Sequence, residues 1–131
     1  MSQENVNVVR EAWEAAERHD NEAILPLYDA DVEIQGLHGL GDRVFRGVGG
    51  VREFWRDWNA SWSESGSEVE EWIDAGDNVI AVMHLWGRGK RSGVPVEARQ
   101  SHVWTVRGGK LWRLWVYDTR DEALKAVGLE E

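Results

Sequence analysis

Four strand-like runs in the second half of the chain restrict its fold more than any other feature. They are rich in β-branched and aromatic residues and cover residues 68–74, 78–89, 94–106 and 110–118, with the short turns AGDN, GKRSG and RGG between them. The first half has helical spacing instead. The order predicts helices first and strands after, in a single domain over residues 1–131, a length that can bury a substantial core.

Apolar residues in the first half recur at helical steps. The stripe that predicts the first helix consists of Val6, Val9, Trp13 and Ala16. A short second helix capped by Asp20 or Asn21 follows, then a short strand over residues 31–36 and a glycine-rich loop over 37–50. The stripe of the third helix consists of Val51, Phe54, Trp55, Trp58 and Trp62. In residues 119–128, Thr119 and Glu122 have the spacing of a capping box, which predicts a last helix.

The composition excludes several classes of protein. The chain has no cysteine, so thiolate metal sites and cysteine nucleophiles are absent, and its four histidines lack ligand spacing. Neither a metal nor another cofactor is expected. The net charge is -9 and the basic residues are scattered, which argues against a nucleic-acid partner. No apolar run is long enough to span a membrane, and the charged N-terminus lacks a signal core, so a cytoplasmic protein is expected.

Alternation along the last two strands predicts which side chains face the core. The even positions are the more apolar on both strands, so they should share one face. A three-residue turn with Gly109 in the left-handed conformation pairs residue 106 with 110 and keeps even opposite even. Gln100, His102 and Asp118 would then point inward. Their apolar neighbours on this face would be Trp104, Trp112, Leu114 and Val116.

The opposite face of the sheet carries further aromatic rings. The side chains expected there are His84, Trp86, Arg113, Trp115 and Tyr117. The core of a single domain does not account for rings in these positions, and exposed aromatic surface is typical of an interface. The simplest interpretation is a homodimer that packs through the outer face of the sheet.

The stretches VVREAWEAAERHDNEAILPLYDADVE, FRGVGGVREFW and SHVWTVRGGKLWRLWVYDTRDEAL, at their intervals, resemble the SnoaL-like, polyketide cyclase-like branch of the nuclear transport factor 2-like superfamily. The likeness covers essentially the whole chain. It implies an α+β, cone-shaped fold, in which a strongly curved, mixed and mostly antiparallel sheet wraps around the N-terminal helices and a hydrophobic pocket lies between them. Members usually dimerise. They include polyketide cyclases, ketosteroid isomerases and limonene epoxide hydrolases, so the fold does not settle the function.

The residues that carry these activities in the family are missing at the matching positions. The isomerase positions fall near Ala12, Gln35 and Ser101, the hydrolase positions at Ala81 and Met83, and the shared acid–base aspartate at Val116. Asp118 follows two residues later on the same face, either in the pocket or supporting the cap of the last helix. In residues 31–36 two orientations stay open. Alternation buries Val32 and Ile34, whereas the resemblance turns Glu33 and Gln35 toward the cavity.

Two functions follow. The first is a protein that binds a small apolar molecule without an assignable reaction. The second is an acid–base enzyme, isomerase-, cyclase- or epoxide hydrolase-like, acting on a small hydrophobic or polyketide-like substrate. Its candidate catalytic residues are Asp118, His102 and Glu33, with His102 either catalytic or a hydrogen-bonded core histidine. Tyr28 is either a second hydrogen-bond donor or an amphipathic boundary residue. The candidate ligand-binding residues are Trp13, Tyr28, Gln35, Trp55, Trp58, Gln100, Trp104 and Val116.

Overall fold

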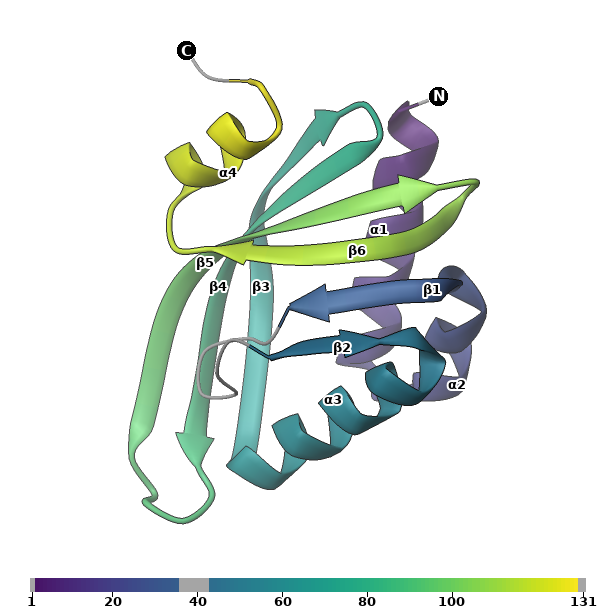
Figure 1. Ribbon diagram of the computed structural model, residues 1–131. Coiled ribbons are helices and arrows are strands. Elements are labelled where there is room, and N and C mark those ends of the chain that lie inside the picture. Colours follow the sequence, from purple (N-terminus) through teal and green to yellow (C-terminus); the bar gives the residue numbers. More distant parts are fainter. Residues whose placement is uncertain (1, 36–42, 130–131) are drawn as a thin grey trace.

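The computed structural model describes residues 2–35 and 43–129 and shows helices beside one large sheet (Figure 1). The helices are α1 (Ser2–Glu17), α2 (Asn21–Ile24), the 3-10 helix η1 (Leu25–Leu27), α3 (Gly47–Ser61) and α4 (Arg120–Ala126). The strands are β1 (Tyr28–Gln35), β2 (Val44–Arg46), β3 (Trp62–Ala75), β4 (Asn78–Gly89), β5 (Pro95–Arg107) and β6 (Lys110–Tyr117). No helix in the described part of the chain is long and apolar enough to cross a membrane.

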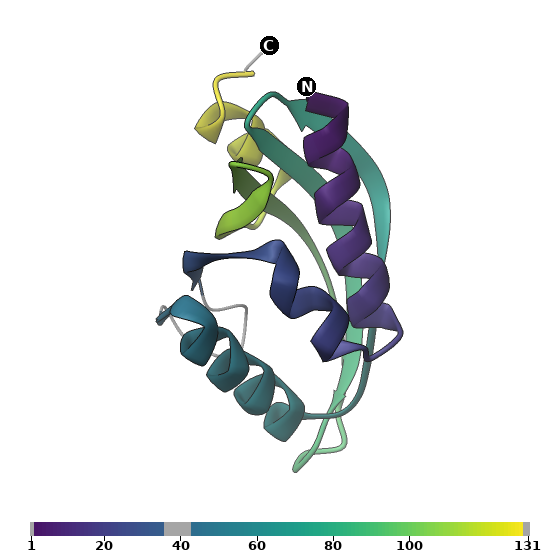
Figure 2. The ribbon, with the colours of Figure 1, turned by 90° about the vertical axis from the view of Figure 1, so that its right-hand side faces the viewer.

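The sheet has the strand order β2-β1-β6-β5-β4-β3. Strands β1 and β6 pair in parallel, and every other neighbouring pair is antiparallel. In the side view of Figure 2 the long strands bend as an arc, with α3 on the opposite side of the interior. The predicted α+β fold with a curved, mixed and mostly antiparallel sheet is therefore confirmed.

Local sequence signals account for the starts of α2 and α4. Asp20 caps α2, because its carboxylate accepts a hydrogen bond from the backbone N–H of Ala23 at 3.2 Å. Thr119 caps α4 by accepting from the N–H of Glu122 at 3.1 Å, as the capping-box spacing predicts. The predicted glycine-rich loop over residues 37–50 is wrong in its second half, where β2 and the first turn of α3 lie. Residues 36–42 are outside the described part of the chain.

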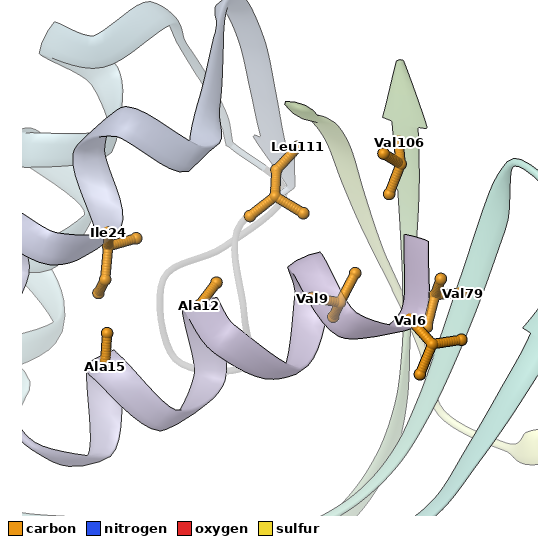
Figure 3. Close-up of a cluster of buried hydrophobic side chains, with 8 residues drawn as sticks. All are labelled: Val6, Val9, Ala12, Ala15, Ile24, Val79, Val106 and Leu111. Atoms are coloured by element: carbon orange, nitrogen blue, oxygen red, sulfur yellow. The ribbon is translucent and has the colours of Figure 1, made fainter. Parts of the chain in front are cut away.

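One face of α1 packs against the sheet, as Figure 3 shows, through the side chains called here the packed cluster. Its members are Val6, Val9, Ala12, Ala15, Ile24, Val79, Val106 and Leu111. The buried stripe differs from the predicted one, because Ala12 and Ala15 replace Trp13 and Ala16. Ala12 and Ala15 are buried on this face of α1, and the bulky indole of Trp13 lies beside it, half-buried.

The hairpin between β5 and β6 uses a different turn from the one predicted. Arg107 pairs with Lys110 across Gly108 and Gly109, which have φ values of 57° and 77° and form a two-residue turn. That turn alone would place even residues opposite odd ones. A bulge on β6 opposite Thr105 and Val106, with Trp112 as its extra residue, shifts the register and restores the pairing of even positions, with Trp104 opposite Leu114 and His102 opposite Val116.

The bulge also reverses the predicted position of Trp112. Leu111 takes the inward place in the packed cluster. The ring of Trp112 instead lies between two guanidinium groups, with Arg107 at 4.2 Å and Arg113 at 4.1 Å from its centroid. The shared face of His102 and Trp104 with Leu114 agrees with the prediction, whereas the inward Trp112 is wrong.

Helix α4 covers part of the outer face of the sheet. Its Ala123 and Leu124 pack with Ile80 and Val103, and Tyr117 lies against the same cluster. Tyr117 was expected at a subunit interface, but contacts within its own chain account for its position. Trp86 remains 45% exposed and lies over Gly66, where a Cβ atom would come within 2.7 Å of the indole.

Candidate functional site

A cavity of about 350 Å³ lies between the end of α1, α2, α3 and the inner face of β3, β4 and β5. Apolar side chains form much of its wall: Ile24, Phe54, Trp55, Trp58, Met83 and Leu85. Exposed or half-buried polar side chains form its mouth: Glu17, His19, Asn21, Asn59, Ser65 and Ser67. The cavity is therefore apolar where it is deep and polar where it meets solvent.

His102 is the polar side chain at the deep end. It is 6% exposed, lines the cavity, and its Nε2 lies 3.2 Å from Oε1 of Gln100. An amide oxygen only accepts hydrogen bonds, so Nε2 carries the proton and Nδ1 keeps a lone pair. Burial lowers the pKa of His102 to about 4, so the ring is neutral at physiological pH. The site therefore offers a ligand a hydrogen-bonding imidazole without a charge.

A chain of three side chains orders the mouth of the cavity. The indole N–H of Trp13 donates to the Ser67 hydroxyl at 3.1 Å, and that hydroxyl donates to the Glu17 carboxylate at 2.6 Å. No motif in the sequence indicates Glu17 or Ser67 as a site residue. Glu17 lies one turn after Trp13 on α1, a weak signal, and its partner Ser67 is fifty positions away on β3.

Tyr28 packs behind the wall and does not line the cavity. Its ring centroid is 6.5 Å from that of Trp55 and 6.1 Å from that of Trp104, so it supports the aromatic wall from behind. Burial raises the pKa of the Tyr28 hydroxyl well above its ordinary value. This places Tyr28 and Trp104 as supporting residues of the wall, whereas both were expected to contact the ligand.

Strand β1 follows its own alternation. Val32 and Ile34 are buried against α3 and β2, and Glu33 lies on the other side, 3.6 Å from Arg46 and 3.4 Å from Arg113. The family resemblance implies that Glu33 faces the cavity, and this orientation is wrong. The apolar residues Val32 and Ile34 occupy the core side of the strand, so Glu33 faces the opposite side. Gln35 bridges two strands, since its Oε1 accepts from the backbone N–H of Val116 at 2.8 Å.

Three of the predicted residues line the cavity, and the others, Gln35 and Val116 among them, are not in its lining. The lining contains His102, Trp55 and Trp58. Trp13 and Gln100 lie outside the lining and form hydrogen bonds with two lining residues, Ser67 and His102 respectively. Asp118 lies instead at the exposed end of β6, immediately before the cap of α4, which differs from its expected place on the cavity wall. Among residues 2–35 and 43–129, no group of three or more His, Asp or Glu side chains is arranged to hold a metal ion.

Solved structures share this fold over nearly the whole chain. A nuclear transport factor 2-like protein of unknown function from Burkholderia pseudomallei has a TM-score of 0.80 at 20% identity, with 95% of this chain and 97% of that chain covered. A putative SnoaL-like polyketide cyclase from Jannaschia has a TM-score of 0.77 at 14% identity, with 98% and 94% covered. A Mycobacterium tuberculosis protein in complex with estradiol-17beta-hemisuccinate has a TM-score of 0.71 at 20% identity, with 87% and 92% covered.

At these identities, structural similarity establishes the fold alone. No curated protein sequence matches the chain. The family is established by sequence, because the profile of the SnoaL-like domain matches residues 9–114, which is most of the chain. The chain therefore belongs to the SnoaL-like domain family, with the nuclear transport factor 2-like fold.

Proposed function

We propose that this protein binds a small, largely apolar molecule in the cavity between α1, α3 and the inner face of the sheet. The composition of the lining supports this most directly. The deep wall consists of Ile24, three aromatic rings from α3 and two apolar side chains from β4, with the neutral His102 as its polar group. Pockets of this kind, apolar with a few placed polar groups, are typical of small-molecule sites.

The fold is also used for such ligands in a structural neighbour. The Mycobacterium tuberculosis protein of similar fold was solved with estradiol-17beta-hemisuccinate, a molecule with a largely apolar ring system. In the present chain a ligand hydroxyl could donate to Nδ1 of His102, while Gln100 holds the other ring nitrogen. The ligand's rings would lie against Trp55 and Trp58.

Binding is favoured over acid–base catalysis by the positions of the candidate carboxylates. Glu33 faces Arg46 and Arg113 on the outer side, and Asp118 is exposed before α4, so neither lines the cavity. A pKa of about 4 also makes His102 a poor proton acceptor near neutral pH, where general bases work best with a pKa close to the operating pH.

Blocking the cavity tests the proposal. Ala16 lines the mouth and is exposed on α1, so Ala16→Phe fills space at the entrance without disturbing the buried core. Calorimetric titration with the neutral probe naphthylethanol should show binding to the wild type and a loss of at least about tenfold in affinity, roughly 1.4 kcal/mol, in the variant.

Ala60→Phe is the matched control, because Ala60 is also exposed on a helix but is not a lining residue. It should bind the probe as the wild type does. Absence of naphthylethanol binding to the wild type, or equal affinities for the wild type and Ala16→Phe, would contradict the proposed site.

A further inference from the structure

The charge of the cavity lining is one-sided. Among its described residues, Glu17 is the one carboxylate, there is no lysine or arginine, and the other titratable side chains are two histidines, His19 at the mouth and His102 at the deep end. His102 adds no charge, because burial keeps it neutral. The chain as a whole carries a net charge of -9, so no general excess of positive charge offsets Glu17. The local potential at the mouth therefore favours cations and opposes anions.

The carboxylate of Glu17 is held in place. The Trp13 indole can only donate, so the Ser67 oxygen must accept its hydrogen bond at 3.1 Å. The single hydroxyl proton of Ser67 then goes to Glu17 at 2.6 Å. A carboxylate can accept about four hydrogen bonds, of which Ser67 uses one. A ligand group that meets Glu17 must consequently be a hydrogen-bond donor.

The mouth also suits a charged group energetically. Glu17, His19, Asn21 and Asn59 are all exposed, so a ligand cation there keeps part of its hydration and avoids most of the cost of burial. Deeper in the cavity, Trp55 and Trp58 form part of the apolar wall that the apolar body of the ligand would contact. The site is therefore matched to a molecule with an apolar ring system at one end and a cationic group at the other.

We propose that the ligands of this cavity are apolar ring compounds that carry a protonated amine, and that Glu17 at the mouth recognises the ammonium group. This inference rests on the proposed binding function and names its ligand class. A ligand with a carboxylic acid in the same place would meet the Glu17 carboxylate and be disfavoured.

Three probes with one ring skeleton test the proposal: naphthylethylamine, naphthylethanol and naphthylacetate. Calorimetric titration at neutral pH and low ionic strength should give the order amine, alcohol, acid, with about tenfold between amine and acid. This range in affinity is modest because an exposed ion pair is weak and a like-charge contact costs a similar amount. Added salt should reduce the difference in affinity between the amine and the acid, because it screens the charges.

Glu17→Gln should remove this order, since the amide keeps the shape and loses the charge. Glu11→Gln is the matched control, an exposed glutamate on the same helix that does not line the cavity, and it should preserve the order. Equal binding of amine and acid to the wild type would overturn the inference while leaving the proposed function standing. An amine preference that persists in Glu17→Gln would overturn the role of Glu17. Failure of all three probes would refute the proposed function itself, and the inference with it.

Discussion

The inner face of the sheet has two halves. One half is packed by side chains of α1, and the other half borders a cavity. In the packed half, the first turns of α1 place Val6 and Val9 against Val79, Val106 and Leu111, and the space is filled. In the hollow half, Ala16 and Glu17 of the last turn of α1 line a cavity of about 350 Å³ that remains open. Both halves are apolar, so hydrophobic patterning alone does not distinguish a core from a pocket.

Strand length and curvature produce the difference. Strand β3 has 14 residues and β5 has 13, and both extend past the end of α1 (Figures 1 and 2). Register shifts between Trp62 and Glu64 and between Val69 and Glu71 mark bulges in β3, which bend the strand. The far wall then comes from α3, whose large rings line the space without filling it.

The outer face of the sheet also has two different halves, one covered by a helix and one exposed. Behind the packed half, α4 covers Ile80 and Val103. Behind the hollow half, His84 lies between Glu68 and Glu97, and its ring is 5.3 Å from that of Trp86. Trp86 is 45% exposed there. The half that leaves space inside also leaves apolar surface outside.

Truncating one leucine in each half should give the largest contrast. Leu111 is fully buried in the packed half, so Leu111→Ala should lower the free energy of unfolding by about 2–5 kcal/mol. Leu85 is half-buried and already borders a cavity, so Leu85→Ala should lower it by less than about 2 kcal/mol. Urea unfolding measures both. Equal losses would mean that the two halves are packed alike.

Acid should destabilise the hollow half through His102. In the unfolded chain a histidine takes up a proton below about pH 6.5, whereas burial holds the pKa of folded His102 at about 4. The unfolded state therefore binds more protons between these values, and stability falls as the pH is lowered through this window. Once the pH is below both pKa values, the free energy of unfolding should be lower by on the order of 3 kcal/mol.

The measurement is the difference between wild type and His102→Gln in free energy of unfolding as the pH falls from 7 to 4. Carboxylates such as Asp29, whose pKa is lowered by its hydrogen bond from Arg107, contribute equally to both proteins and cancel. Parallel pH profiles for the two proteins would show that water reaches His102 and that the deep end of the cavity is not dry.

A smaller effect is expected on the outer face. We propose that a second copy of the chain covers the surface around Trp86, so that wild type is a dimer. Trp86→Glu would place a charge in an apolar interface and weaken association by at least about 2 kcal/mol. Light scattering should then find the variant monomeric. Val48→Glu changes an exposed valine on α3 and should leave the dimer intact. A monomeric wild type at micromolar concentration would rule out this interface.

Side-chain pattern was sufficient for the order of elements and for much of the core. Alternation buried Val32 and Ile34 correctly, and capping chemistry placed the start of α4 at Thr119. The same pattern placed His102 on the inner face with Leu114. These signals are local, because they depend on residues a few positions apart in one helix, strand or hairpin.

The predictions that failed depend on contacts between distant segments. The sequence by itself determined that the more apolar positions of β5 and β6 share one face, but the structure achieves this by a bulge at Trp112 instead of a longer turn. Because of this bulge, Leu111 occupies the core position and Trp112 lies outside the core. The meeting of Glu17 with Ser67 was likewise decided by how the end of α1 lies on a bent β3. Helical and strand periods fix which face a residue lies on, whereas the curvature of the sheet fixes which faces meet and where space remains between them.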